Sequence, residues 1–358
     1  MISYMRIAII GFYPPPIGGI STHIARLKEH LDLAKVDYTL YDVSGEHAKV
    51  KDEQRVVVCK SFLRLAIKLF ISKRCVIHFH NFSRRHIPLY AFLALRHRTV
   101  LSFHNERFLA DIQGSKVRFM SKLYVLLLNL VHFFITDSPR TAELAKKVVR
   151  NAKKIYMVPE FIPPASIPEI DADDKIMQMR GKHRYLIAST AYRISFHQGQ
   201  DLYGIDLLIE MLRRLVHDGI DAAICFTLPN IGDEKYYQAL TAHIDEYGLK
   251  DRFYFITTPL REASSLYKIC NVYVRATNTD GNSLSVLEAM AVRTPVLASD
   301  CVPRPPGVRL FKTRDINDLY ENIKTLLNKN EAEKAMLEKH KIVNNVAKFL
   351  ALYRYFSS

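Results

Sequence analysis

Residues 270–300 read CNVYVRATNTDGNSLSVLEAMAVRTPVLASD, and this stretch decides the fold. The apolar run 270–274 predicts a buried strand that ends in a polar turn. The amphipathic segment 283–292 predicts a helix with Ser283 at its N-cap, and residues 295–298 predict the next buried strand. The stretch therefore predicts a strand–turn–helix–strand unit of an α/β domain.

The turn of this unit predicts an anion site. A helix that begins just past the end of a strand presents unpaired N–H groups and the positive end of its dipole. Such an end suits a diphosphate. Asp280 lies in the turn and Glu288 lies one to two helical turns further on, so two carboxylates flank the predicted site.

The same alternation of buried strands and amphipathic helices continues along the chain and predicts a doubly wound α/β architecture. A proline-rich stretch, 158–168, separates two halves of this kind. In the first half we expect strands near 5–11, 38–42, 75–80, 99–103 and 132–136, and helices near 20–33, 61–72, 86–95, 115–130 and 139–149. In the second half we expect strands near 184–189, 222–227, 253–256, 271–275 and 295–298, and a helix near 204–217.

Charge is concentrated in the first half. The 358 residues hold 51 Lys+Arg and 36 Asp+Glu, a net charge of +15, and residues 1–165 account for 26 of the basic and 12 of the acidic ones. Such an excess implies an anionic partner, either nucleic acid or an anionic membrane surface. The basic amphipathic pattern of residues 60–74, with Lys60, Arg64 and Lys68 four residues apart, favours the membrane.

The other compositional signals indicate a globular protein of a reducing compartment. The five cysteines are odd in number, scattered and mostly within apolar runs, which predicts buried thiols. A buried strand is predicted close to the first residue, with no signal peptide ahead of it. The longest apolar run, 123–135, is too short to cross a bilayer, so we expect a core helix there.

The 270–300 stretch resembles the acidic signature of retaining nucleotide-sugar glycosyltransferases of the GT-B fold, specifically family 4. That signature has a Glu, seven residues, a second Glu, Ala-Met-Ala and then Pro-Val. Here Asp280 takes the place of the first Glu and Glu288 is the second. The resemblance implies that Glu288 binds the nucleotide ribose and that Asp280 binds the sugar hydroxyls. The diphosphate would lie on the helix start formed by Gly281, Asn282, Ser283 and Leu284.

Two segments of the first half extend the resemblance. Residues 11–23 read GFYPPPIGGISTH, where a strand gives way to a rigid turn and to a helix that we expect to be capped by Ser21 or Thr22. Gly18 and Gly19 are similar to the family's Gly-Gly loop beside the donor. His104 is similar to its strand-end His, which contacts the transferred sugar. A second pair, His78 and His80, shares one strand face; we expect a hydrogen-bonded pair rather than a metal site.

A second phosphate-binding element is predicted after residue 188. Arg193 fits the family's phosphate-binding Arg, but Tyr203 stands where the family has a Lys. This is the clearest departure, because a leaving diphosphate needs a counter-charge. Arg275 is our candidate replacement for that Lys. The resemblance implies neither a catalytic metal nor a cofactor, and it assigns catalytic roles to His104, Asp280 and Glu288.

Taken together, the resemblance implies a GT-B glycosyltransferase of two Rossmann-like doubly wound domains facing a central cleft. Residues 1–165 would form the acceptor domain and 166–340 the nucleotide-sugar domain, and a helix in 341–358 would cross back to the first. We expect transfer from a nucleotide-sugar to a lipid-linked or oligosaccharide acceptor, with retention, at the cytoplasmic face of an anionic membrane. Two alternatives stay open: a nucleic-acid-binding protein with a Rossmann-like core, and a nucleotide-sugar epimerase-like enzyme.

Overall fold

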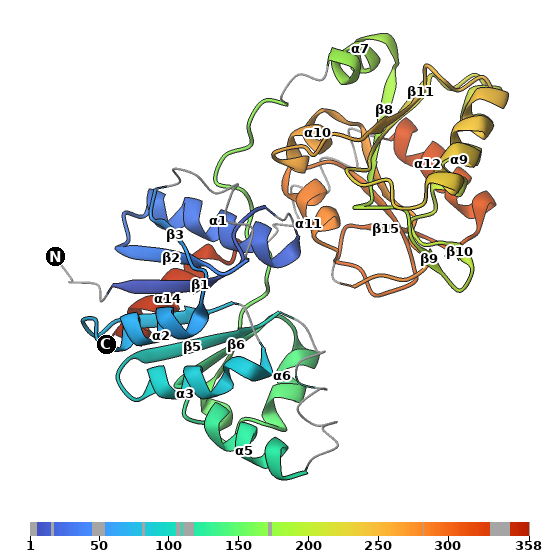
Figure 1. Ribbon diagram of the computed structural model, residues 1–358. Coiled ribbons are helices and arrows are strands. Elements are labelled where there is room, and N and C mark those ends of the chain that lie inside the picture. Colours follow the sequence, from blue (N-terminus) through green and yellow to red (C-terminus); the bar gives the residue numbers. More distant parts are fainter. Residues whose placement is uncertain are drawn as a thin grey trace. The chain divides into compact units, whose positions relative to one another are not determined.

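The computed structural model describes residues 6–15, 18–44, 54–80, 83–104, 109, 118–170, 174–281, 283–329 and 344–357. The chain divides into two compact units. Unit 1 comprises residues 1–165 and 344–358, and unit 2 comprises residues 166–343. Each unit is built around its own parallel sheet (Figure 1).

The sheet of unit 1 has the order β3-β2-β1-β4-β5-β6-β7, with neighbouring strands parallel. Its strands are β1 (Ile7–Gly11), β2 (Tyr38–Asp42), β3 (Val56–Val58), β4 (Val76–Phe79), β5 (Arg98–Phe103), β6 (Phe133–Thr136) and β7 (Ile155–Met157). The order reverses between β1 and β4. In open α/β sheets, ligands bind at the carboxyl ends of strands at such a switch point.

Helices cover both faces of this sheet because alternate strand residues point to opposite sides. Ile7 and Ile9 of β1 face α1 (Gly19–Leu33) and α14 (Val346–Ser357). Ala8 and Ile10 face the other core, where α2 (Phe62–Phe70), α3 (Ile87–Ala94), α5 (Arg118–Leu128) and α6 (Pro139–Lys146) lie. Short 3-10 turns occupy Arg84–His86 and Ala152–Lys154. Figure 1 shows α14, in red, against this unit.

Unit 2 repeats the plan with the parallel order β12-β11-β8-β13-β14-β15, which reverses between β8 and β13. Its strands are β8 (Tyr185–Thr190), β11 (Ala222–Thr227), β12 (Phe253–Ile256), β13 (Val272–Arg275), β14 (Val296–Ser299) and β15 (Arg309–Phe311), with a hairpin of β9 (Phe196–His197) and β10 (Gln200–Asp201). One face carries α8 (Ile205–His217), α9 (Glu234–Glu246) and α12 (Ile316–Asn328). The other carries α7 (Asp174–Lys182), α10 (Ala263–Ile269) and α11 (Leu284–Ala291).

The structure confirms the predicted fold class, two Rossmann-like doubly wound domains with the C-terminal helix packed on the first. The expected cap of the first helix was wrong. Helix α1 begins at Gly19 with Gly18 at its N-cap, and the Ser21 hydroxyl accepts a hydrogen bond from the Gly18 amide at 2.9 Å. Ser21 thus lies inside the first turn, because a glycine can take the extended N-cap conformation without a side-chain cap.

Nine of the described helices and strands were not predicted: β3, β7, β9, β10, β15, α7, α9, α10 and α12. The five strands have two or three residues each, which is too short for an alternating pattern to emerge. Residues 158–170 form neither helix nor strand, as their prolines predict. Within the described residues, no helix is both long and apolar enough to cross a membrane.

Candidate functional site

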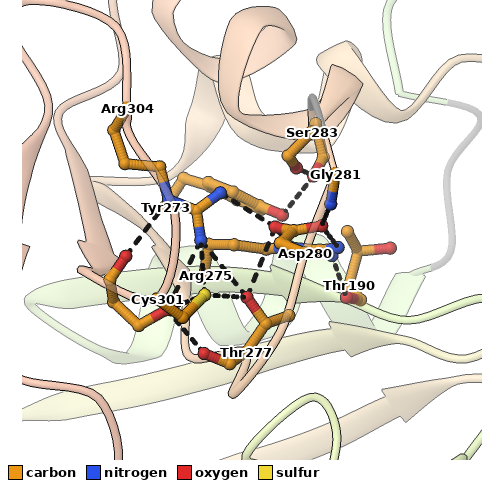
Figure 2. Close-up of polar contacts among 11 residues, drawn as sticks. Thr190, Tyr273, Arg275, Thr277, Asp280, Gly281, Ser283, Cys301 and Arg304 are labelled. Carbon is orange, nitrogen blue, oxygen red and sulfur yellow. Dashed lines mark hydrogen bonds and ion pairs between the residues drawn. The ribbon is translucent and has the colours of Figure 1, made fainter. Parts of the chain in front are cut away.

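The candidate donor site lies at the switch point of the unit 2 sheet. Strand β13 ends at Arg275, beside the end of β8 at Thr190. The chain then turns through residues 276–281 before α11 begins at Leu284. Figure 2 shows the polar contacts that hold this turn, with Arg275, Asp280 and Arg304 at their centre. The predicted strand–turn–helix–strand unit is therefore present at the sheet edge where ligands bind in this architecture.

Asp280 is the acceptor around which this turn is organised. Both of its oxygens accept from Arg275, through Nε and Nη2 at 3.0 Å each. Arg304 Nη1 donates to the same carboxylate at 2.8 Å, the Thr277 hydroxyl at 3.3 Å and the Gly281 amide at 3.0 Å. Burial alone would raise the pKa of Asp280, but the two arginines outweigh it and the pKa is lowered. Asp280 is therefore a charged carboxylate whose bonding capacity is filled by protein donors.

Arg275 links three segments of the site. Its Nη1 donates to the Thr190 carbonyl at 3.2 Å, and its guanidinium carbon lies 5.2 Å from the centre of the Tyr203 ring. The predicted substitute cation thus lies against the residue that stands where the resembling family has a Lys. Three recorded hydrogen bonds leave two of its five N–H groups without an acceptor among the described residues.

Arg304 is a site residue that the sequence did not reveal. It follows β14, 24 positions after Asp280, and its side chain is 3% exposed. Its Nε donates to the Ser299 carbonyl at 3.1 Å and its Nη2 to the Thr277 hydroxyl at 3.2 Å. Cys301, a half-buried free thiol, lies in the same group of contacts. A basic residue between two prolines, in the loop from β14 to β15, carries no periodic signal, so only the structure identifies it.

The start of α11 has the predicted form with one difference. Ser283 occupies the N-cap, but its hydroxyl makes no cap and bonds instead to the Ser285 hydroxyl at 3.0 Å. The first N–H groups of α11 therefore receive no side-chain cap from Ser283. Gly281 is exposed and Leu284 half-buried. Asn282, the remaining predicted diphosphate contact, lies outside the described residues.

Glu288 lies on α11 and is buried. Burial raises the pKa values of two buried phenols, Tyr267 and Tyr273, and the negative charge of Glu288 raises them further. Tyr273 in turn donates to the Ser285 hydroxyl at 2.6 Å. Glu288 thus shares the polar layer beneath the α11 N-terminus, as a second carboxylate of this region.

Arg193 makes no hydrogen bond or ion pair with the described residues of this cluster or with any other described residue. It is exposed on the segment between β8 and β9. The loop after it is tightly constrained: Gly204 has a φ of +65°, and a Cβ there would lie 2.4 Å from the Ala276 carbonyl oxygen. Only glycine fits this close approach between the start of α8 and the residue after β13.

Unit 1 gathers four histidines at its own switch point. His80 Nδ1 lies 3.0 Å from His104 Nε2, and His80 Nε2 lies 3.1 Å from His78 Nδ1. His23 of α1 lies beside them, with its ring centre 5.3 Å from those of His80 and His104. His78 and His80 therefore form the hydrogen-bonded pair that their alternation predicts, buried in unit 1.

His104 is held on both sides. Its Nδ1 contacts the Glu160 carboxylate and its Nε2 contacts His80. Burial alone would raise the pKa of Glu160, but the hydrogen bond from His104 outweighs it and lowers the pKa. Since both ring nitrogens are engaged, a sugar hydroxyl would have to replace one of these partners. The role of His104 at the sugar stays a prediction.

Gly18 and Gly19 are exposed at the start of α1. Among the described residues, no group of three or more His, Cys, Asp or Glu is arranged to hold a metal ion. All five cysteines are described, and none of them forms a disulfide.

Comparison with known proteins agrees with this architecture. Residues 190–343 match the family model "Glycosyl transferases group 1". No curated protein matches the chain in sequence. Among solved structures, a glycosyltransferase from Rickettsia africae ESF-5 is similar, with a TM-score of 0.68, 14% identity and 99% of each chain covered.

Two further solved structures share the fold. Anabaena Alr3699/HepE in complex with UDP has a TM-score of 0.61 and 14% identity, over 98% of this chain and 96% of that one. The lipopolysaccharide outer core galactosyltransferase WaaB has a TM-score of 0.56 and 14% identity, over 96% and 98%. Residues 190–343 therefore match the group 1 glycosyltransferase model, and the two-domain fold of these solved structures is shared over nearly the whole chain.

Proposed function

We propose that this protein is a glycosyltransferase that moves a sugar from a nucleotide-diphosphate donor, held by unit 2, to a lipid-linked or saccharide acceptor. The observation that carries the proposal is the arginine-rich cluster at the β8/β13 switch point, beside the uncapped start of α11. Two guanidinium groups and a helix N-terminus converge there, within the segment that matches the group 1 family. That is the electrostatic environment that a diphosphate requires.

The proposed roles follow the positions of the groups. Arg275 binds the diphosphate with its two uncommitted N–H groups, and Arg193, exposed and unpaired with any described residue, adds a second cation. The amides of Ser283 and Leu284 donate to phosphate oxygens. Glu288 binds the nucleotide ribose. Contact of Asp280 with the sugar stays a prediction, since a hydroxyl would have to displace one of its five donors.

Assignment to family 4, retention of anomeric configuration and the roles of Gly18, Gly19 and His104 rest on the sequence resemblance. Neighbours of the same fold support a nucleotide-sugar donor: the Anabaena protein was solved with UDP-glucose. We propose a nucleotide-sugar donor for this chain on that ground together with the cluster described above.

The test is a transfer assay. The protein is incubated with a panel of nucleotide-sugars, with and without lipid extract and oligosaccharides, and release of nucleoside diphosphate is measured. We expect release that depends on an acceptor and falls at least about 100-fold in Glu288→Ala, which removes a group from the donor site. A fully active Glu288→Ala protein would overturn the site. Conversion of the donor sugar without transfer would favour the epimerase-like alternative.

For the acceptor side we propose that unit 1 contacts an anionic membrane. Residues 54–104 hold ten Lys or Arg and no Asp or Glu. Helix α2 buries Leu65, Ala66 and Leu69, yet it also exposes a second apolar row: Leu63 is 56% exposed, Ile67 52% and Ile71 75%. Arg64 and Lys68 are exposed beside that row. Apolar side chains flanked by cations suit the headgroup region of an anionic bilayer.

The same core face of unit 1 carries α3 and α5, and both add to this pattern. Leu95 after α3 is 72% exposed and is followed by the exposed Arg96. Helix α5 exposes Met120, Leu123 and Leu126, with Lys122 among them. The pattern is therefore repeated on more than one element of the unit, which supports a membrane-facing surface rather than one isolated apolar row.

Vesicle flotation tests this surface. We expect binding to phosphatidylglycerol vesicles that is reduced by Ile67→Ser and by Arg64→Gln/Lys68→Gln, while Leu310→Ser, at an exposed apolar position of unit 2, leaves it unchanged. Equal binding by all variants would remove the membrane proposal. Salt-sensitive binding to duplex DNA in place of vesicles would favour the nucleic-acid alternative.

A further inference from the structure

Arg304 gives the candidate site a charge that neither the sequence pattern nor the comparisons assign. It reaches Asp280 from the segment after β14, while Arg275 reaches the same carboxylate from the end of β13. All three side chains are largely buried, with exposed fractions of 3%, 12% and 8% for Arg304, Arg275 and Asp280. Figure 2 shows the two arginines meeting at this one acid.

The arrangement carries one net positive charge. A buried Arg275–Asp280 pair alone would be neutral, and its attraction for a phosphate would be largely cancelled. Arg304 adds the second guanidinium, so the trio carries the charge of a single lysine. The guanidinium of Arg275 lies over the ring of Tyr203, the residue that occupies the family's lysine position.

Arg304 itself is committed to the protein. Its donors serve Asp280, the Ser299 carbonyl and the Thr277 hydroxyl. Arg275, in contrast, keeps two N–H groups that have no acceptor in the part of the chain that the structure describes. The two arginines therefore differ in role. Arg304 supplies a positive charge and holds Asp280, whereas Arg275 still has N–H groups that can donate to a ligand.

We propose that Arg304 is a positioning residue of the diphosphate site: it donates to the same Asp280 oxygen as Arg275 Nε, fixes the Arg275 guanidinium through that acid, and leaves the trio with one positive charge for the donor. This inference rests on the proposed function. The buried Glu288 adds a negative charge to the same region. With Glu288 counted, loss of Arg304 would leave the region net negative where a diphosphate must enter.

The test separates charge from fold by comparing a nucleoside diphosphate with its nucleoside. Calorimetry with UDP, GDP and ADP first identifies the nucleotide that the wild-type protein binds. Arg304→Gln should weaken binding of that diphosphate by about tenfold to 100-fold, as expected for loss of a close charge in a buried site, and should leave binding of the corresponding nucleoside within about twofold. Arg304→Lys, which keeps the charge, should recover part of the loss.

The matched control is Arg314→Gln, which removes one positive charge from unit 2 at the Asp206 ion pair and should not discriminate between diphosphate and nucleoside. Thermal unfolding of each variant reports whether it is folded. Equal weakening of diphosphate and nucleoside in Arg304→Gln, or no weakening, overturns this inference while the proposed function stands. A folded wild-type protein that binds none of the three diphosphates overturns the proposed function and this inference with it.

Discussion

The two switch points of this protein bury titratable groups in opposite ways. In unit 1, His23, His78 and His80 lie beneath the strand ends, and burial lowers the pKa of each. In unit 2, Arg275 and Arg304 occupy the equivalent place, and they keep their charge. The architecture is the same, but the unit 1 site holds buried histidine rings beside the Glu160 carboxylate, whereas the unit 2 site holds two arginines paired with one acid.

The difference follows from what each side chain can do when it loses water. A histidine can release its proton and remain as a neutral donor–acceptor, so a chain of rings can satisfy itself by hydrogen bonds. An arginine stays protonated, so burial requires a counter-ion, which Asp280 provides. Arginine donors can attract a diphosphate, whereas histidine rings beside the Glu160 carboxylate cannot, which is why we propose that the donor binds unit 2.

Removing Asp280, the counter-ion of the two arginines, should have the largest effect on the free energy of unfolding. Asp280→Asn leaves two buried guanidinium groups without a carboxylate, and we expect it to lower the free energy of unfolding by about 3–5 kcal/mol. Urea unfolding followed by circular dichroism measures this. Asp206→Asn, at the more exposed ion pair with Arg314, is the control and should cost no more than about 1 kcal/mol. A loss at Asp280 as small as that at Asp206 would mean that the cluster is not held by its charges.

As the pH falls, unit 1 should lose folding stability at a higher pH than the unit 2 cluster does. Burial lowers the pKa of His23 from 6.5 to about 4. The unfolded chain therefore binds this proton first, and stability falls as the pH drops from 6.5 towards 4. His23 alone accounts for roughly 3 kcal/mol of that loss, and His78 and His80 act in the same direction.

The lowered pKa values of Glu160 and Asp280 also contribute stability that acid removes, but only below their unfolded values of 4.5 and 3.8. The measurement is urea unfolding between pH 7 and 4.5. His217→Asn, at an exposed histidine, should leave the profile unchanged. Equal stability at pH 7 and pH 5 would contradict the neutral-histidine description.

Removing a single hydrogen bond of the histidine cluster should have the smallest effect on the free energy of unfolding. The Tyr353 hydroxyl lies 2.6 Å from His78 Nδ1 and ties α14 to the end of β4. We expect Tyr353→Phe to cost about 1 kcal/mol, as for one buried neutral hydrogen bond. Tyr192→Phe, at a tyrosine that is 56% exposed and whose hydroxyl bonds to no other described residue, is the control. No difference between the two variants would show that α14 is held by packing alone.

Local patterns predicted much of this structure because they depend on neighbours in sequence. The buried run before Arg275, the turn at Asp280 and the helix containing Glu288 each follow from periodicity and capping within residues 270–300. The strand alternation of His78 and His80 predicted that they share a face.

Contacts between distant residues were not accessible in this way. Arg304 joins Asp280 across 24 positions, and Tyr353 joins His78 across 275. Neither side chain belongs to a motif, and the partner of each is set by how the strands are ordered in the sheet. The resemblance suggested the function that we propose for the turn, but the contacts of Arg304 and of the four histidines could be identified only from the structure.

The central claim is that unit 2 binds a nucleoside diphosphate at the Arg275–Asp280–Arg304 cluster and Glu288. Calorimetric titration of the wild-type and Glu288→Ala proteins with UDP, GDP and ADP tests it most directly. We predict that the wild type binds one of these nucleotides and that Glu288→Ala loses most of that affinity while it remains folded. Binding of none of them by a folded wild type, or equal binding by both proteins, would contradict the account.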